Sequence, residues 1–417
     1  MNHSENIDQD AVLRARTMLL GSGWPSLSQE VEAYRVLAKV SPAAYLPKLV
    51  RALNAYGPGF RDRPDMRLAL DAEAAEAARR LDATETNGAR LLCQALHAYQ
   101  HALFSVGRRE EGLAVCEEVA EVGRRTLEQR GAARNGYGRR LAAVLAEEGR
   151  HGEAADVCAL DARAARSGPS FGESVARSAE LDAAGRHGDA LDVFAELVDA
   201  TRRGAEEGSD PRAVLVWALV HRSRMPAAAG HCREAGADRR EVLTLLARLA
   251  RSGDSGDPGD LLPRWANLFT LSGRAVEAAG SVEAPGPPFG HELRFWSRAT
   301  IEAYFDGIPA LEAEAAGRPG PGGLSDQVTA HYRLTLRSGL FQVRHPQRFE
   351  ESLRPLFDEG VALARRLPEE PGASVRALTD RSMFLVAAKR YEEAHADFAE
   401  AVALLDGIVP PSIVTRT

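Results

Sequence analysis

Three side chains that can bind a metal follow one another at helical spacing in the first quarter of the chain. Cys93, His97 and His101 are each four residues apart, so they would share one face of an α-helix. Two histidines at this spacing can bind zinc. From Cys93 to His101, however, the helix rises by about 12 Å, which is too far for three ligands of one ion. We therefore expect the two histidines to bind a partner, to face solvent or to pack between helices, rather than to hold a metal.

Two glycine-rich segments have the residue types of catalytic or phosphate-binding loops but not their context. GDSGDP from Gly253 resembles the GDSGGP around the nucleophile of trypsin-like serine proteases. Those proteases are β-barrels, and Asp257 would place a negative charge where the transition state needs hydrogen-bond donors. GRPGPGG from Gly317 lacks the following Lys-Ser/Thr of a phosphate loop. With no nucleophile–base pair or cofactor loop, we expect no enzyme, catalytic residue, cofactor or resident metal.

Composition excludes several classes of protein. The 417 residues include 52 basic and 59 acidic side chains, for a net charge of −7, whereas nucleic-acid-binding proteins usually carry a basic excess. The longest unbroken apolar run, Ala213–Val220, is much shorter than the ~20 residues of a membrane-spanning helix. The first residues lack the apolar region of a signal peptide, and the four cysteines form no CxxC motif. We expect a reduced, cytoplasmic protein with no nucleic-acid or membrane partner.

A short pattern recurs roughly every 40 residues along the chain. A turn, usually Gly-Arg, is followed by two or three polar residues and then by Ala at a fixed offset. Apolar residues recur at i, i+3, i+4 and i+7 on both sides of each turn, which is typical of two amphipathic helices. Repetition at this period indicates one helix pair stacked many times. The copies begin at Gly107, Gly149, Gly185, Ser223, Gly273, Gln347 and Lys389, with a degenerate copy near Asp306.

The local chemistry of the turns supports this interpretation. Glycine ends helices readily because it adopts a positive φ without strain, and the acidic residues after the turns suit the positive end of the next helix. No sustained alternating stretch rich in Val, Ile and Thr is present. The sequence therefore predicts an all-α protein that is more than about two-thirds helical, well above the usual proportion.

The repeat resembles the tetratricopeptide repeat (TPR), a helix-turn-helix unit of about 34 residues. In the copy at Lys389, Tyr391, Ala394, Phe398 and Ala401 fall on the signature positions of that family. The segment from Tyr34, YRVLAKVSPAAYLPKLVRALNAY, is similar to a repeat junction in actinobacterial TPR proteins. The resemblance implies a right-handed α-solenoid of roughly eight to ten TPR-like helix pairs.

This resemblance also implies a domain organisation. Residues 24–405 would form the solenoid, preceded by an N-terminal capping segment, 1–23, and followed by a C-terminal tail, 406–417. The Pro/Gly-rich segment 251–263 is either a long inter-helix loop of one continuous solenoid or a hinge.

Proteins of this family bind partners in the concave groove formed by the first helix of each pair, and the family offsets place nine residues of this chain there. We expect the stripe of His97, His101 and Phe104 to be partly exposed, with an imidazolium meeting an acidic partner. Two arginines among the nine would clamp a peptide carboxylate. The aromatic and basic patch around Trp296 would form a pocket wall, unless the indole fills a gap between helices. The candidates are His97, His101, Phe104, Arg139, Glu147, Asp182, Asn267, Trp296 and Arg298, of which Arg139 and Arg298 are the clamps.

Three cysteines occupy a shared position in the repeat. Cys116, Cys158 and Cys232 lie at the offset that Phe194 and Phe398 take in other copies. That offset is a core position of the second helix, and free Cys behaves as a small buried hydrophobe. We therefore expect all three to be buried.

These observations lead to two hypotheses for function. The first is a scaffold or adaptor that binds a protein or peptide in its concave groove. The second is a regulatory sensor in which a small molecule or a signalling peptide changes the curvature of the solenoid.

Overall fold

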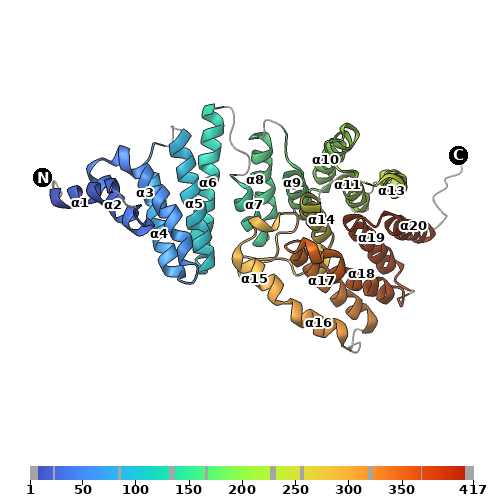
Figure 1. Cartoon of the computed structure of the whole chain (residues 1–417). Coiled ribbons are helices and arrows are strands. Elements are labelled where there is room, and N and C mark those ends of the chain that lie inside the picture. Colours follow the sequence, from blue (N-terminus) through green and yellow to red (C-terminus); the bar gives the residue numbers. More distant parts are fainter. Residues whose placement is uncertain are drawn as a thin grey trace. The chain divides into compact units, whose positions relative to one another are not determined.

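The chain folds into α-helices that pack against their neighbours in sequence order (Figure 1). The computed structural model describes residues 8–21, 24–82, 86–130, 137–164, 168–225, 232–253, 258–317, 323–367 and 369–408. It is 82% helical, and no strand occurs in those ranges. The predicted all-α class is therefore confirmed. Within the same ranges, no helix is both long enough and apolar enough to cross a lipid bilayer.

The helices fall into two compact units. The N-terminal unit contains Met1–Val144, Leu160–Gly168 and Ser297–Ala299, and the C-terminal unit contains Leu145–Ala159, Pro169–Trp296 and Thr300–Thr417. Each unit is described by itself below.

The N-terminal unit is a succession of antiparallel neighbours in which α1 packs on α2, α2 on α3, and so on to α6. Ser26 caps α2 with a capping box, in which its side chain accepts from the Gln29 backbone and Gln29 accepts from the Ser26 backbone. The elements of this unit are α1 (Gln9–Leu20), α2 (Leu27–Val40), α3 (Pro42–Tyr56), η1 (Gly57–Phe60), α4 (Pro64–Arg79), α5 (Thr86–Ser105), α6 (Arg109–Arg130) and the first part of α7 (Arg139–Glu147).

The C-terminal unit continues the helix pairs. Its closest pairs are α9 with α10, α11 with α13, α16 with α17, and α19 with α20. Its elements are α8 (His151–Ala164), α9 (Phe171–Ala183), α10 (His187–Glu207), α11 (Arg212–Arg224), α13 (Cys232–Ser252), α14 (Pro258–Ser272), η2 (Arg274–Val276), η3 (Leu293–Phe295), α15 (Arg298–Asp306), α16 (Ile308–Ala316), α17 (Gly323–Gln342), η4 (Pro346–Arg348), α18 (Phe349–Ala364), α19 (Pro371–Ala387) and α20 (Tyr391–Ile408).

Four of the predicted turns have the expected geometry. Gly107, Gly149 and Gly185 have φ values of 77°, 74° and 78°, and each lies between two α-helices. Lys389 takes the same position between α19 and α20 with φ 59°, a conformation that side chains rarely adopt. The repeat pattern therefore identified these helix boundaries correctly.

The copy at Gly273 does not form a second helix, contrary to the expectation. α14 ends at Ser272, and a short 3₁₀ turn leads into residues 277–292, which contain no helix and which we call the strap. Three prolines in the strap oppose a helix because they lack the amide donor. Close contact also requires glycine here, since a Cβ on Gly280 would lie 2.2 Å from the Glu147 carbonyl oxygen.

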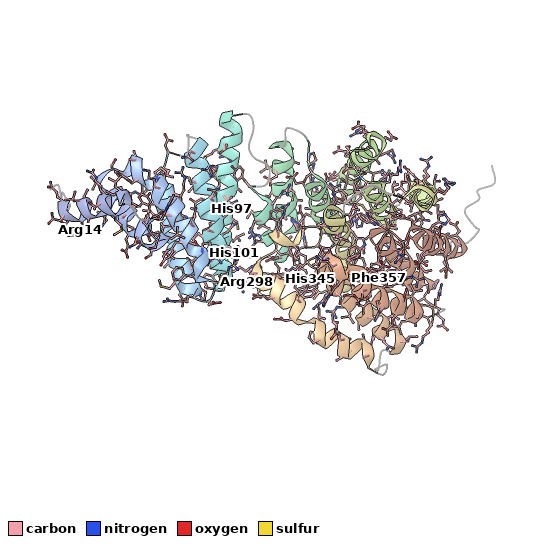
Figure 2. The ribbon with its side chains drawn as sticks, viewed as in Figure 1. Arg14, His97, His101, Arg298, His345 and Phe357 are labelled. Carbon is pink, nitrogen blue, oxygen red and sulfur yellow. The ribbon has the colours of Figure 1, made fainter. Side chains whose placement is uncertain are left out.

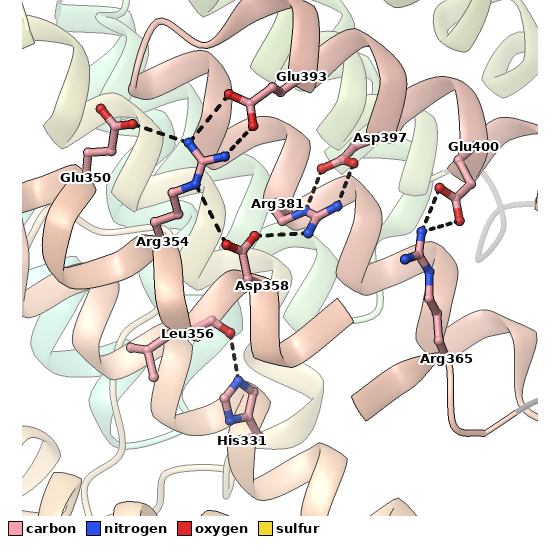
Figure 3. A network of polar contacts seen from close by, with 10 residues as sticks. All are labelled: His331, Glu350, Arg354, Leu356, Asp358, Arg365, Arg381, Glu393, Asp397 and Glu400. Atoms are coloured by element: carbon pink, nitrogen blue, oxygen red, sulfur yellow. Dashed lines mark hydrogen bonds and ion pairs between the residues drawn. The ribbon is translucent and has the colours of Figure 1, made fainter. Parts of the chain in front are cut away.

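Aromatic stacking and ion pairs hold the last helices together. Trp265 of α14 stacks on Phe269 and meets Phe349 of α18 edge-on, and Phe357 of α18 stacks on Phe384 of α19 with ring centroids 4.5 Å apart. Figure 3 shows the polar side of this packing. There Arg381 of α19 binds Asp397 of α20 at 2.7 and 2.8 Å and Asp358 of α18 at 3.0 Å, so one guanidinium joins three helices.

The cysteines are only partly as expected. Cys116 is buried, as are Phe194 and Phe398 at the same repeat offset. Cys158 is half-exposed, so that expectation was wrong, because α8 fully buries few of its described side chains. The side chain of Cys232 lies outside the described residues.

Candidate ligand-binding groove

The largest described hollow of the C-terminal unit lies between α9, α11 and the end of α14. It has a volume of about 290 Å³. Its lining includes small and polar side chains from all three elements, so it is open to a ligand with both apolar and polar groups. These side chains include Ala179, Asp182, His221, Arg224, Ser272 and Arg274.

Two smaller hollows continue from the first. The middle one, of about 20 Å³, lies between α11, α14 and α19 and shares His221, Arg224 and Ser272 with the largest. The third, of about 30 Å³, lies between α17, α18 and α19 and shares Asp380 with the middle one. Because each hollow shares side chains with the next, we treat the three as one groove.

Helical periodicity explains which side chains face the groove. On α14, Trp265, Phe269 and Ser272 follow at i, i+4 and i+7 and share one face. On α11 the apolar run Ala213–Val220 is entirely buried. His221 and Arg224, at i and i+3, therefore bring polar groups to the groove only at the end of that helix.

Ion pairs fix the two sides of the groove. Arg274 pairs with Asp182 and also donates to the Ala179 carbonyl oxygen at 2.6 Å. His187 Nδ1 lies 2.7 Å from the other oxygen of Asp182. Arg224 donates to Asp380 Oδ1 at 2.7 Å. Arg224 and Arg274 thus each lie beside a carboxylate, so the groove presents charges of both signs.

His221 lies between these charges and is neutral at physiological pH. Burial lowers its pKa to about 3, and the nearby positive charges of Arg224 and Arg274 add to this effect. Its ring packs against Phe194, with centroids 4.9 Å apart. An uncharged imidazole in the groove can both donate and accept a hydrogen bond.

The shifted pKa of His221 predicts how stability depends on pH. The folded pKa is far below the ordinary value of 6.5, so the stabilisation is present above pH 6.5 and is lost as the pH falls towards 3. At pH 5 the loss is about 2 kcal/mol. We measure the free energy of unfolding in urea at pH 7 and at pH 5. Between these two values, the free energy of unfolding of the His221→Phe variant should fall by about 2 kcal/mol less than that of the wild type. Equal losses in both proteins would contradict the assignment.

A buried carboxylate joins α9, which forms one side of the groove, to the strap. Glu180 lies 2.7 Å from His151 Nδ1 and 3.1 Å from His291 Nε2. Burial raises the pKa of this carboxyl, but the hydrogen bonds from both imidazoles outweigh that effect, and the pKa is lowered. Gly290 packs directly on Ala179, where a Cβ would lie 2.4 Å from the alanine methyl group. The strap thereby holds the α9 side of the groove in place.

The predicted histidine stripe belongs to the N-terminal unit. His97 and His101 lie on α5 (Figure 2), His97 exposed and His101 half-buried. The pKa of each is lowered, first by desolvation of the imidazole ring, which is partial for His97 because that residue is exposed, and then by neighbouring arginines, Arg140 for both. In the chain without a partner the imidazolium is therefore disfavoured, and the expectation that it meets an acidic partner stays a prediction.

Phe104, the third member of the stripe, is buried and only 4% exposed. A Cβ on Gly112 of α6 would lie 2.8 Å from its ring, so the ring packs tightly across the helix pair. The expectation that Phe104 is partly open to solvent was wrong, because α6 covers its ring at Gly112. The Cys93 thiol on the same helix is also buried, and burial raises its pKa to about 11.

The remaining candidates are divided between the two units. Arg139 is half-buried and Arg298 is exposed, and both belong to the N-terminal unit. Glu147, Asn267 and Trp296 belong to the C-terminal unit and are buried, so their expected exposure to a partner was wrong. Of the nine predicted residues, Asp182 is the one that lines the described hollows.

Two of these buried residues show why the family offsets misled. Trp296 Nε1 donates to the His291 carbonyl oxygen at 2.9 Å, and its ring meets Phe289 and Tyr304 edge-on. The indole therefore fills a gap under the strap, which was the alternative that the sequence left open. Asn267 lies one helical turn before Leu271, which lines the largest hollow. Neither side-chain amide atom of Asn267 has a hydrogen-bond partner among the described residues.

Sequence reasoning missed most of the groove. His221, Arg224, Trp265, Arg274 and Asp380 were not among the predicted residues, although all five line it. A usable signal was present in α11, where His221 and Arg224 directly follow a long apolar run. Polar side chains at the end of a buried helix need partners, which suggests a polar hollow.

Comparison with known proteins gives no family assignment. Neither a scan against models of protein families nor a search of curated proteins finds a match to this chain.

Proposed function

We propose that the chain is a TPR-like protein that binds a protein or peptide partner in the groove of its C-terminal unit. In this proposal the helix pairs form a right-handed α-solenoid of roughly eight to ten repeats. The regular turns at Gly107, Gly149, Gly185 and Lys389 support it, as does the packing of helices in sequence order.

The observation that carries this proposal is the series of three neighbouring hollows, which share lining side chains, along α9, α11, α14, α17, α18 and α19. A succession of small hollows suits an extended chain, whose side chains enter one hollow after another. The polar groups also suit a peptide, because Arg224, Arg274, Asp182 and Asp380 offer both donors and acceptors for main-chain amides.

The test uses the full chain and a variant with a blocked groove. Peptides are selected from a random library on the wild-type protein, and their affinities are measured by fluorescence polarisation. Ala275 is exposed and lines the largest hollow, so Ala275→Trp should fill it without disturbing the core. We expect this change to weaken binding by at least about tenfold, because the blocked side chains lose their contacts, and to leave the melting temperature nearly unchanged.

The matched control is Ala403→Trp, at an exposed position of α20 that lines none of the three hollows. It should bind the selected peptides as the wild type does. Failure to select any peptide, or equal affinity of the Ala275→Trp variant, would refute the proposal.

The second candidate function is a ligand-responsive sensor. The observation that favours it is the size of the largest hollow, whose 290 Å³ is near the lower limit for small-molecule sites. Small-angle scattering distinguishes the two functions, since a sensor should change its radius of gyration when saturated with ligand and a rigid scaffold should not.

A further inference from the structure

Two side chains that line the middle hollow each carry a buried polar atom without a partner among the described residues. Trp265 of α14 is 1% exposed and Asp380 of α19 is 3% exposed, and both line this hollow. Among the described residues, Trp265 Nε1 and Asp380 Oδ2 have no hydrogen-bond partner. A buried polar atom without a partner destabilises the protein, so a ligand that forms a hydrogen bond with each of the two atoms would gain binding free energy from both.

Two other polar groups around this hollow already have partners, while His221 and Arg224, which also line it, add an imidazole that can donate or accept and a guanidinium that can donate. Trp217 Nε1 donates to the Met383 carbonyl oxygen at 3.2 Å, and the Ser272 hydroxyl donates to the Phe269 carbonyl oxygen at 2.6 Å. Arg224 occupies the other oxygen of Asp380, Oδ1. A ligand that pairs with both unpartnered atoms must therefore offer an acceptor to Trp265 Nε1 and a donor to Asp380 Oδ2.

We infer that the middle hollow binds a primary carboxamide, the side chain of Asn or Gln in a bound peptide. The carboxamide oxygen would accept from Trp265 Nε1, and its amino group would donate to Asp380 Oδ2. A carboxylate has no donor and would face the negative charge of Asp380, whereas an ammonium has no acceptor for the indole. A primary carboxamide therefore matches the two unpartnered atoms, Trp265 Nε1 and Asp380 Oδ2.

The size of the hollow limits what it can hold to a small group. One water needs about 10–15 Å³ of such space, and the hollow has about 20 Å³. A peptide main chain continues in both directions and does not fit a hollow this small, but the end of a side chain does. As a peptide specificity, this inference rests on the proposed function, while the carboxamide site itself can be tested without a peptide.

The experiment observes the indole groups directly in the full chain. The protein has four tryptophans, and labelling them with ¹⁵N gives one indole N–H resonance each, with Trp265 assigned from the Trp265→Phe variant. Acetamide is the probe. We expect a saturable downfield shift of the Trp265 proton at millimolar acetamide, because the indole gains an acceptor. Trp217 is the internal control, since it lines the same hollow but already has a partner.

Related probes test the chemistry of the site. N,N-dimethylacetamide lacks the N–H donor and acetate carries a negative charge, so each should bind at least about tenfold more weakly than acetamide. Ethanol, which carries a hydroxyl group, should also bind more weakly. No saturable Trp265 shift with acetamide, or equal binding of dimethylacetamide or ethanol, would overturn the inference.

Asp380→Asn provides the sharpest variant. Its oxygen can still accept from Arg224, while its amino group replaces the free acceptor by a donor. We expect acetamide binding to fall at least about tenfold and acetate binding to strengthen, which inverts the preference. Should this variant fail to fold, Trp265→Phe removes the indole donor together with part of the buried ring, and saturation transfer to acetamide should then show the loss of binding. Unchanged acetamide binding in the folded variant would overturn the inference.

The experiments distinguish failure of the carboxamide site from failure of the proposed peptide-binding function. An acetamide site in a protein that selects no peptides would leave the carboxamide site standing and remove the peptide function. Selected peptides without any preference for Asn or Gln, together with an unshifted Trp265 resonance, would keep the function and remove the carboxamide site.

Discussion

Replacing Trp296 by Ala should lower the free energy of unfolding by about 3–5 kcal/mol, the usual cost of removing a buried aromatic side chain. Trp296 is 2% exposed and fills the space between Phe289 and Tyr304. The change also removes the hydrogen bond from its indole to the His291 carbonyl oxygen. Chemical denaturation of the full chain measures the effect on the C-terminal unit.

Two matched variants separate packing from binding. Trp296→Phe keeps an aromatic ring and should cost less than Trp296→Ala. Arg294→Ala, two residues away, changes an exposed ion pair with Glu292, and such pairs contribute about 0–1 kcal/mol. If Trp296→Ala instead costs less than about 1 kcal/mol and abolishes peptide binding, Trp296 is a partner-binding residue and its placement in the core is incorrect.

The second large effect is expected at the ion pair between α11 and α19. Arg224→Ala leaves the Asp380 carboxylate buried without its guanidinium, and the Arg224 nitrogen is the one described partner of its Oδ1 oxygen. Breaking a buried pair from one side costs about 3–5 kcal/mol. Because the Arg224 side chain is 32% exposed, solvent screening places the expected loss near the lower end, at about 3 kcal/mol.

A double change shows whether the loss comes from the unpaired charge. Arg224→Ala with Asp380→Asn leaves no buried charge at this position, so the double variant should recover much of the stability lost by Arg224→Ala alone. Arg354→Ala is the control at the surface, because its partners Glu350, Asp358 and Glu393 are each about a third to a half exposed, and such pairs contribute about 0–1 kcal/mol each. Equal losses for Arg224→Ala and Arg354→Ala would show that Asp380 is well solvated.

Much of the local structure was predictable from the sequence. The turn glycines at 107, 149 and 185 adopt positive φ, and this preference depends only on glycine itself and on the helices beside it. Phe194 and Phe398 are buried at their shared repeat offset, because a large apolar side chain on the inner face of a helix pair has few alternatives. The exception is Gly273, where the expected second helix does not form because prolines follow the turn. These prolines are present in the sequence, but the prediction gave more weight to the repeat pattern.

The groove was much less predictable, as the individual residues show. The family offsets correctly place a side chain on a helix face, but whether that face meets solvent or another segment depends on what packs over it. Glu147 is covered because the strap, from more than a hundred residues later in the chain, comes against the end of α7, where the Gly286 amide donates to the Glu147 carbonyl oxygen at 2.8 Å. Trp296 is buried for the same reason, since it anchors the strap.

By itself, the sequence determined the helices, their boundaries at the repeat turns and the all-α class, because these depend on periodicity and turn chemistry within a few tens of residues. Only the tertiary structure decided which polar side chains share a hollow. Arg224 and Asp380 are 156 residues apart, and Arg274 and Asp182 are 92 apart. No local pattern encodes such pairs, since they form when helices distant in the sequence pack together. The burial that shifts the pKa of His221, and that leaves Trp265 Nε1 without a partner among the described residues, arises at that same stage.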